Sequence, residues 1–223
     1  EKALGGGVLD GWRVLVTAGG TREPIDPVRF VGNRSSGKMG HALAEEAAAR
    51  GAAVTLVTTA EPPAGRGIEV VEVATAEEMA EAGWSRAGSM DVAVLAAAVA
   101  DFRPAHPATA KLRRADGPPE LVLEPTPDIL AGVAAMQPRP FLVGFAAETG
   151  PVEGAIPKAK SKGVDLLVAN DVTAAGSGFG TDTNQVALIF PNGSVEAWEG
   201  LAKRRVAARL WERIADMRSR GTL

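Results

Sequence analysis

Arg13-Val-Leu-Val-Thr17 is a short apolar run that is followed at once by Ala-Gly-Gly. A run of this length ended by a glycine turn is typical of a buried strand that leads into a loop. Downstream, further apolar runs alternate with helical patterns, which favours a parallel sheet with helices on both faces. We therefore predict an α/β fold with a Rossmann-like, doubly wound, mostly parallel sheet and a late β-hairpin. In such sheets ligands bind where strands end and loops begin.

The predicted elements follow this alternation. Strands are expected at Arg13–Thr17, Ala53–Thr59, Ile68–Ala74, Asp91–Ala100, Leu121–Leu123, Phe141–Ala146 and Leu166–Ala169, with a hairpin of Gln185–Phe190 and Ser194–Trp198 joined by Pro-Asn-Gly. Helices are expected at Gly37–Gly51, from about Ala76, at Pro127–Met136 with Thr126 as N-cap, at Glu153–Gly163 and at Leu201–Met217. The stretch from Phe102 to Glu120 is rich in Pro, Arg and Lys and is expected to form a long, partly mobile loop.

The composition fits one intracellular globular domain. The chain has 223 residues, 46% of them hydrophobic, with a formal charge of −3 and a pI near 5.6, which argues against a general nucleic-acid binder. The absence of cysteine excludes disulfides, thiolate metal sites and a cysteine nucleophile. No apolar run reaches membrane-spanning length. We expect a cytoplasmic domain over residues 12–223, with no membrane or nucleic-acid partner, after a linker-like lead-in over residues 1–11.

Two nucleotide-binding motifs come close to matching one segment. Gly32-Asn-Arg-Ser-Ser-Gly-Lys38 nearly fits the phosphate loop GxxxxGK[ST], but Met39 stands where a magnesium-binding Ser or Thr is needed, and the segment does not directly follow its strand. We therefore reject a P-loop.

A short-chain dehydrogenase is the second interpretation, because Ser35-Ser-Gly-Lys-Met-Gly40 resembles the cofactor turn of such enzymes. Those enzymes usually need a Tyr-x-x-x-Lys pair, and this chain has no tyrosine. The second strand also ends in Thr58-Thr59, without the acidic residue that holds a ribose hydroxyl. An NAD(P)-dependent reductase is therefore the weaker enzyme hypothesis.

The two motifs share a physical basis that this chain retains. Glycines let backbone amides approach a ligand closely, and a helix N-terminus favours an anion. The glycines alone could serve only a tight turn and close helix–strand packing. Because Asn33, Arg34, two serines and Lys38 crowd the same loop, we predict that this loop binds an anion.

Five longer motifs occur in order along the chain. They are Thr17-Ala-Gly-Gly-Thr-Arg-Glu-Pro-Ile-Asp-Pro-Val-Arg29, Asn33-Arg-Ser-Ser-Gly-Lys-Met-Gly40, Ala97-Ala-Val-Ala-Asp101, Gly144-Phe-Ala-Ala-Glu-Thr149 and Ala169-Asn-Asp171. Together they resemble bacterial phosphopantothenoylcysteine synthetase, from about Trp12 to the final helix. The resemblance implies a homodimeric ligase of coenzyme A biosynthesis that joins 4′-phosphopantothenate to L-cysteine and uses CTP with Mg²⁺. It also implies an upstream flavin-dependent decarboxylase domain, the only part that would carry FMN.

The implied chemistry accounts for the residue types. A carboxylate is a poor electrophile, so transfer to CTP first makes an acyl-cytidylate, with pyrophosphate as the leaving group. The amine of cysteine then attacks, and CMP leaves. The first step brings a carboxylate towards a triphosphate and needs positive charge, whereas the second creates an oxyanion that N–H donors stabilise.

The resemblance gives two residues catalytic roles. Asn33 holds the acyl group and supports turnover of the acyl-cytidylate, and Lys111, in a mobile-loop lysine motif, serves the first half-reaction at the CTP. Taken alone, Asn33 is typical of a turn and Lys111 of a solvated surface. Asp101 is expected to end the central strand, where its carboxylate can meet Mg²⁺ or a ribose hydroxyl, or simply cap the next loop.

The other implied contacts form two groups. Nucleotide contacts are implied for Ser36, Ala97, Asp101, Lys111, Pro127, Asp128, Ile129, Phe145, Lys158 and Lys162, and substrate contacts for Arg29, Asn33 and Ala98. Lys158 and Lys162, spaced i, i+4, share a helix face, although Lys160 could exchange roles with either. Arg29 could bind the pantothenate phosphate through its guanidinium fork or form a structural salt bridge with Asp26. His41 and His106 are taken as incidental.

The sequence alone leaves some alternatives open. No single residue decides between CTP and ATP, and the late hairpin and the Pro-rich loop are both candidates for a dimer interface. A nucleotide-sensing or dimerisation module, which would bind CTP without turnover, is the non-enzymatic alternative.

Overall fold

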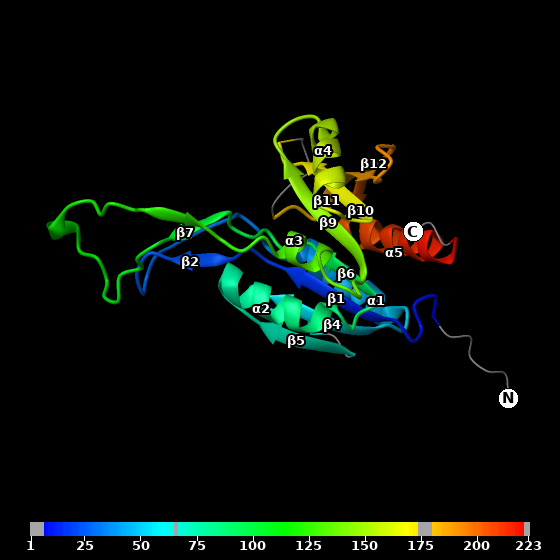
Figure 1. Cartoon of the computed structure of the whole chain (residues 1–223), viewed down its shortest axis with the longest axis horizontal. Helices are drawn as coiled ribbons and strands as arrows, with labels where there is room; N and C mark the ends of the chain where they lie inside the picture. Colours follow the sequence, from blue (N-terminus) through cyan, green and yellow to red (C-terminus); the bar gives the residue numbers. More distant parts are fainter. Residues whose placement is uncertain (1–6, 65–66, 174–179, 221–223) are drawn as a thin grey trace.

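Six parallel strands form the centre of the computed structural model, which describes residues 7–64, 67–173 and 180–220 (Figure 1). They are β1 (Arg13–Ala18), β4 (Ala53–Thr58), β5 (Ile68–Glu72), β6 (Val92–Leu95), β9 (Phe141–Glu148) and β10 (Leu166–Asp171). Across the sheet they lie in the order β5-β4-β1-β6-β9-β10, so their order along the chain reads 3-2-1-4-5-6, as in dinucleotide-binding Rossmann sheets. An antiparallel hairpin of β11 (Thr183–Ile189) and β12 (Val195–Ala202) extends the β10 edge, which confirms the predicted fold class.

Helices cover both faces of the sheet. The helices α1 (Lys38–Ala49) and α5 (Lys203–Ser219) pack on one face, and α2 (Ala76–Ala87), α3 (Ile129–Ala134) and α4 (Ile156–Ser161) on the other. Strand β1 serves both layers, because Val14 and Val16 join the α1/α5 core while Leu15 joins the opposite one. The first and last helices are also joined directly, since the buried Trp211 indole donates to the carbonyl of Leu43 at 2.9 Å. Among the helices in the described ranges, none is both long and apolar enough to cross a bilayer.

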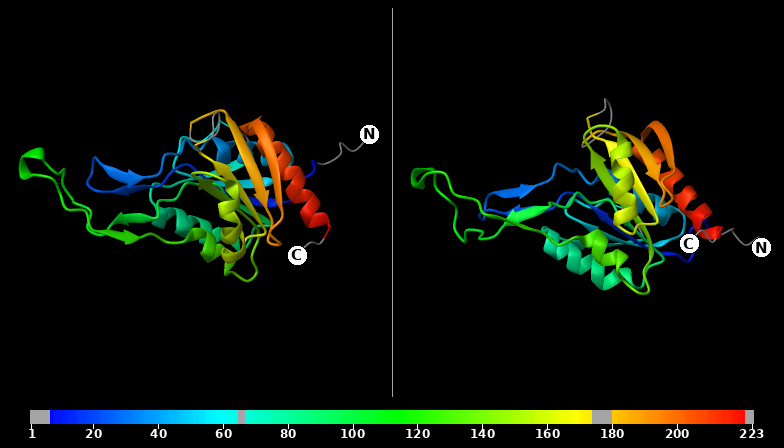
Figure 2. Two further views of the ribbon diagram at one scale, coloured as in Figure 1. Left: turned by 90° about the horizontal axis from the view of Figure 1, so that it is seen from above. Right: turned by 45° about the horizontal axis from the view of Figure 1, so that its top comes forward.

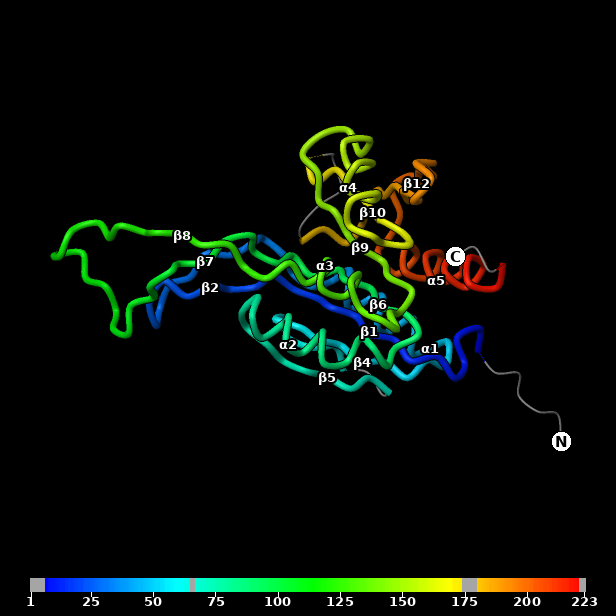
Figure 3. The backbone as a smooth tube through the Cα atoms, in the orientation of Figure 1, coloured from blue at the N-terminus to red at the C-terminus, as the bar shows by residue number. Residues whose placement is uncertain are grey.

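Two antiparallel ribbons project away from the sheet. In one, β2 (Arg22–Pro24) pairs with β3 (Phe30–Gly32), and in the other β7 (Phe102–Pro104) pairs with β8 (Leu123–Pro125). The ribbons run side by side, and the β7–β8 connection extends furthest from the core (Figures 2 and 3). We call residues 22–32 and 102–125 the arm. Exposed large apolar side chains gather on the arm; they are Val28, Phe30, Phe102, Leu121, Val122 and Leu123.

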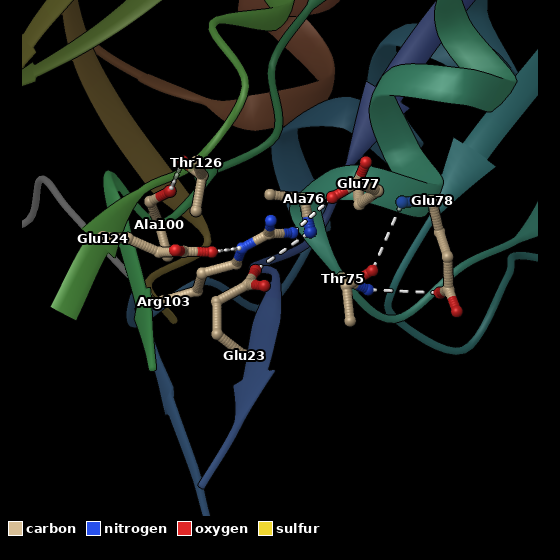
Figure 4. Close-up of polar contacts among 9 residues, drawn as sticks. All are labelled: Glu23, Thr75, Ala76, Glu77, Glu78, Ala100, Arg103, Glu124 and Thr126. Atoms are coloured by element: carbon tan, nitrogen blue, oxygen red, sulfur yellow. Dashed lines mark hydrogen bonds and ion pairs between the residues drawn. The ribbon is translucent and has the colours of Figure 1, made fainter. Parts of the chain in front are cut away.

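A polar network fixes the base of the arm on the N-terminal end of α2 (Figure 4). Arg103 of β7 bonds to Glu77 of α2 and, at 2.8 Å, to Glu124 of β8. Both hydrogen bonds raise the pKa of Arg103 above its usual value. Glu23 of β2, almost fully buried, accepts from the backbone N–H of Ala76 at 2.9 Å. The arm is therefore held to the sheet domain by side chains from both of its ribbons.

The predicted central strand Asp91–Ala100 is too long. Strand β6 ends at Leu95, and beyond it the regular ladder gives way to a single bridge between Ala98 and Gly20, while the N–H of Ala97 donates to the hydroxyl of Thr17 and that of Ala100 to the hydroxyl of Thr21. The prediction that Asp101 ends the central strand is therefore wrong. Asp101 lies where the chain enters the arm.

Other boundaries differ for similarly local reasons. The stretch from Phe102 to Glu120 is not all loop, because it contains β7 and a 3₁₀ turn at Arg114–Asp116, and the short strand is β8 rather than Leu121–Leu123. The N-cap of α3 is Asp128, whose carboxylate accepts from the N–H of Ala131; the predicted cap, Thr126, instead donates to the carbonyl of Ala100.

The remaining changes concern the two ends of the chain and the region before β10. Helix α5 starts two residues later than predicted, because Leu201 and Ala202 pair in β12. The predicted helix Glu153–Gly163 is divided into a 3₁₀ turn, Val152–Ala155, and α4. Of the linker-like residues 1–11, the first six lie outside the described ranges, and Leu9 is fully buried in the α1/α5 core.

Candidate functional site

A pocket of about 520 Å³ lies at the carboxyl ends of β1, β6, β9 and β10. Between β1 and β6 the chain reverses its direction of travel across the sheet, and ligands of open α/β sheets bind at such a switch point. The lining comes from the β3–α1 loop, the segment after β6, the start of α3, and the ends of β9 and β10. The pocket is therefore where the sequence pattern predicts ligand binding.

Ten of the thirteen site residues expected from the sequence line this pocket. They are Asn33, Ser36, Ala97, Ala98, Asp101, Pro127, Asp128, Ile129, Phe145 and Lys162. The other three, Arg29, Lys111 and Lys158, are not part of its lining. Arg29 and Lys111 belong to the arm, and Lys158 to α4. The structure thus gathers residues that are more than a hundred positions apart in the sequence.

The end of β1 and the residues after it bring the β3–α1 loop and the segment after β6 together beside the pocket. A Cβ on Gly20 would lie 2.5 Å from the carbonyl oxygen of Asn33, so only glycine allows the β3–α1 loop to approach β1 so closely. The side-chain amide of Asn33 donates to the carbonyl of Val99 at 2.8 Å, which links this loop to the segment after β6. The hydroxyls of Thr17 and Thr21 accept from that same segment, as described above.

Lys162 and Asp128 form an ion pair at the pocket wall. Burial alone would raise the pKa of Asp128, but the hydrogen bonds from Lys162 and from the N–H of Ala131 outweigh it and hold the pKa below its usual value. Lys158, one helical turn before Lys162, pairs instead with Glu148 at 2.7 Å, outside the lining. Lys160 lies against the hairpin turn at Gly193. Of the three lysines, only Lys162 reaches the pocket.

Asp26 and Arg29 form a salt bridge of 3.3 Å in the arm. The Asp26 side chain is fully buried and accepts from the backbone N–H groups of Val28, Arg29 and Leu112. Burial would raise the pKa of Asp26, but these hydrogen bonds and the guanidinium of Arg29 hold it below its usual value. Arg29 in turn donates to the carbonyl of Leu112. The salt bridge between Arg29 and Asp26, one of the two roles expected for Arg29, is therefore formed. Arg29 also holds Leu112, the residue next to Lys111.

The sequence pattern did not find two residues that line the pocket from the end of the chain. Asn184 of β11 is buried, and Lys203, the first residue of α5, has only 8% of its surface exposed. A lysine at the start of an amphipathic helix carries no local signal of a site. Lys203 reaches the pocket only through the sheet order, which places the hairpin at the β10 edge, and through the packing of α5 against α1.

The fold and the site together define a Rossmann-ordered α/β domain with a pocket at its switch point, whose lining includes the lysines Lys38, Lys162 and Lys203. The model of the family "DNA/pantothenate metabolism flavoprotein C-terminal domain" matches residues 9–217. The chain belongs to this family.

Individual relatives agree with this assignment. The coenzyme A biosynthesis bifunctional protein CoaBC of Mycobacterium tuberculosis (strain ATCC 25618 / H37Rv) is 47% identical over 220 residues, covering 92% of this chain and 52% of that protein. CoaBC of Thermococcus kodakarensis is 46% identical over 216 residues, covering 94% of this chain and 52% of the relative. The crystal structure of the C-terminal domain of a CoaBC matches with a TM-score of 0.78 and 38% identity, covering 96% of this chain and 98% of that one. The chain spans about half the length of these curated relatives.

Proposed function

We propose that this chain is a ligase domain that joins 4′-phosphopantothenate to L-cysteine through an acyl-cytidylate, converting CTP to CMP and pyrophosphate in coenzyme A biosynthesis. The observation that carries the proposal is the gathering of ten expected site residues at the switch point. Membership of the family and the names of the CoaBC relatives support it. In the same proposal the domain works in the cytoplasm, and FMN belongs to an upstream decarboxylase domain.

In the first half-reaction a carboxylate oxygen bonds to the α-phosphorus of CTP, and the bond from that phosphorus to the pyrophosphate breaks. Lys162 supplies positive charge at the wall, and its pairing with Asp128 keeps the ammonium in place while the site is empty of nucleotide. Pro127 to Ile129 and Phe145 form the adjoining surface for the nucleoside.

Mg²⁺ can fit this site through one protein carboxylate together with the phosphates of CTP. The described residues contain no group of three or more His, Asp or Glu side chains that could hold a metal ion. Mg²⁺ commonly keeps its waters and binds one or two carboxylates plus substrate phosphates, and Asp101, exposed at the pocket, can provide one carboxylate. Bound there with CTP, the ion would neutralise phosphate charge.

In the second half-reaction the amine of cysteine attacks the acyl carbon, and CMP leaves. The developing oxyanion needs a placed N–H donor. The side-chain amide of Asn33 lies at the pocket and is already oriented by Val99, so it is the donor that we propose.

We also propose that the active form is a homodimer in which the arm of one chain completes the site of the other. Lys111 belongs to the arm and does not line the pocket of its own chain, although the family resemblance gives it a role at the CTP. The exposed apolar side chains of the arm provide the surface that a second copy would cover.

The experiment that tests the ligase is pyrophosphate release with 4′-phosphopantothenate and Mg²⁺, comparing CTP with ATP, before and after adding cysteine. We expect release that requires the acid, prefers CTP and speeds up with cysteine. Release without 4′-phosphopantothenate would contradict the order of steps, and no release in any combination would contradict the ligase itself.

The NAD(P)-dependent reductase is not favoured. Strand β4 ends at Thr58, whose hydroxyl accepts from the N–H of Ala60 and lies 3.1 Å from a ring nitrogen of His41. These contacts occupy the position where a dinucleotide-binding sheet needs an acidic side chain for the ribose.

A further inference from the structure

The turn of the β2–β3 ribbon contacts the long connection between β7 and β8 at the backbone of Leu112. The N–H of Leu112 donates to Oδ2 of Asp26 at 3.1 Å, and its carbonyl accepts from the guanidinium of Arg29. Nearby, the N–H of Ala108 donates to the carbonyl of Ile25 at 2.8 Å. We call the contacts of Asp26 and Arg29 with Leu112 the latch.

The two carboxylate oxygens of Asp26 have different partners. Oδ1 accepts from the backbone N–H groups of Val28 and Arg29, at 2.8 and 2.7 Å, and so closes the turn itself. Oδ2 accepts from Leu112, 86 positions away in the chain, and lies 3.3 Å from the guanidinium of Arg29. The turn needs one acceptor oxygen, which an asparagine also provides. The second oxygen requires a carboxylate, because both groups that face it are donors.

Burial makes the latch hard to open. The Asp26 side chain is fully buried, and a buried charge is tolerated only where donors compensate it. When Leu112 moves away, a buried carboxylate oxygen loses a donor, which opposes the movement. The base of the arm is held on α2 through Arg103 and Glu23, as described above. The backbone at Leu112 is therefore fixed relative to the sheet domain.

Lys111 is the neighbour of this fixed residue. Its side chain is exposed and, among the described residues, makes no hydrogen bond or ion pair. A lysine ammonium sits on a flexible stem, so the space that it can reach depends on where its backbone is held. The latch therefore sets the reach of the Lys111 ammonium without touching it.

We propose that Asp26 is a positioning residue of the first half-reaction, which fixes the reach of Lys111 by holding Leu112. The inference rests on the proposed function, because that function places Lys111 at the CTP. It adds that a buried residue outside the pocket lining acts on one half-reaction and not on the other. Asn33, the donor proposed for the second half-reaction, follows β3, and β3 is held by its own pairing with β2.

Asp26→Asn tests this role, because it keeps an acceptor for the turn and puts an amide N–H₂ opposite the two donors at Oδ2. Pyrophosphate release from CTP and 4′-phosphopantothenate measures the first half-reaction. Product formation after cysteine is added to acyl-cytidylate already formed on the enzyme measures the second. We expect the first to slow about tenfold or more, because a misplaced catalytic group is costly, and the second to change less than about twofold. Equal slowing of both steps, as a smaller folded fraction would cause, overturns the positioning role.

A double variant tests whether Asp26 acts through Lys111. In Lys111→Ala chains we expect Asp26→Asn to change pyrophosphate release by less than about twofold, because effects that pass through one group do not add. Slowing that multiplies in the double variant would show that Asp26 acts by another route. Asp116→Asn is the matched control: this exposed carboxylate of the same connection loses the same charge and should leave both rates unchanged.

Amide hydrogen exchange at Leu112 tests the latch without requiring turnover. We expect exchange about tenfold faster in Asp26→Asn than in the wild type, the loss of a charge-assisted hydrogen bond, and no change in Asp116→Asn. Unchanged exchange in Asp26→Asn overturns the latch. Faster exchange in a protein that releases no pyrophosphate would refute the ligase, and with it the part of Asp26 in the reaction, but not the latch. If Asp26→Asn does not fold, Leu112→Pro removes the N–H from the other side of the latch, and the same difference between the half-reactions is expected.

Discussion

Asparagine and aspartate have side chains of nearly equal size, but at position 33 only the amide of asparagine can donate a hydrogen bond. The amide of Asn33 donates to the carbonyl of Val99 and lies at the pocket, whereas an aspartate can only accept there. We expect Asn33→Asp to retain pyrophosphate release in the absence of cysteine and to slow formation of the final product by about 100-fold, the usual effect of losing one oxyanion donor. Single-turnover measurements of the two steps check this. Full turnover at the wild-type rate would refute the role.

Asp26 makes stability depend on pH. Its pKa is held below the ordinary 3.8, so its contribution to stability is fully present above that value and is lost as the pH falls through the folded pKa. We expect Asp26→Asn to lower the melting temperature at pH 7, and the difference from wild type to shrink as the pH falls below about 4. Asp116→Asn, an exposed carboxylate of the same arm, is the control and should change little. A difference that stays constant with pH would contradict this account.

Single residues were predictable where they sit in a motif. The loop from Asn33 to Lys38 and the segment from Ala97 to Asp101 carry their own signal, and both line the pocket. Lys203 carries no such signal, because its position at the pocket comes from the packing of α5 against α1, which is far away in the chain. For Lys158 the motif misleads. Lys158 and Lys162 are spaced i, i+4, but the ion pair with Glu148 holds the Lys158 ammonium outside the pocket.

Among the elements, α1 sits on β1 at a distance that only glycine permits. A Cβ on Gly40 would lie 2.6 Å from the Cβ of Ala18. We therefore expect Gly40→Ala to destabilise the protein by about 1–3 kcal/mol, as overpacking does. Gly83 in α2 is the matched control, since a Cβ there meets nothing closer than 3.9 Å, and Gly83→Ala should stabilise by about 0.5–1 kcal/mol. Chemical denaturation measures the free energy of unfolding of both variants. Equal changes from the wild type would contradict the packing argument.

The buried strands and amphipathic helices were predictable because their patterns reflect burial. The arm was not, since β2, β3, β7 and β8 each have three residues and expose much of their surface, so no periodicity marks them. The end of β6 was missed for another reason. The apolar run continues to Ala100, but the hydroxyls of Thr17 and Thr21, which lie on another segment, accept from Ala97 and Ala100 and leave only a single bridge, between Ala98 and Gly20, in place of the regular ladder.

At the scale of the whole molecule, the proposed dimer predicts complementation between two inactive chains. When Asn33→Asp and Lys111→Ala chains are mixed under conditions that allow exchange, each heterodimer contains one site with an intact pocket and an intact arm from its partner. We expect recovery of about a quarter of wild-type turnover, because about half of the dimers are mixed and one of two sites in each is complete. Each variant incubated alone is the control. A mixture as inactive as its components would show that the arm does not act on a second chain.

The packing of the first helix against the last has a consequence for how the protein folds while it is being translated. Helix α1 emerges early from the ribosome, but the face that it turns towards Trp211 stays uncovered until the final residues of α5 are translated. A nascent chain interrupted before that point lacks the residues of α5 that cover the α1 layer. Because contacts between sequence-distant segments form slowly and leave apolar surface exposed meanwhile, premature termination should yield insoluble fragments rather than a weakened enzyme.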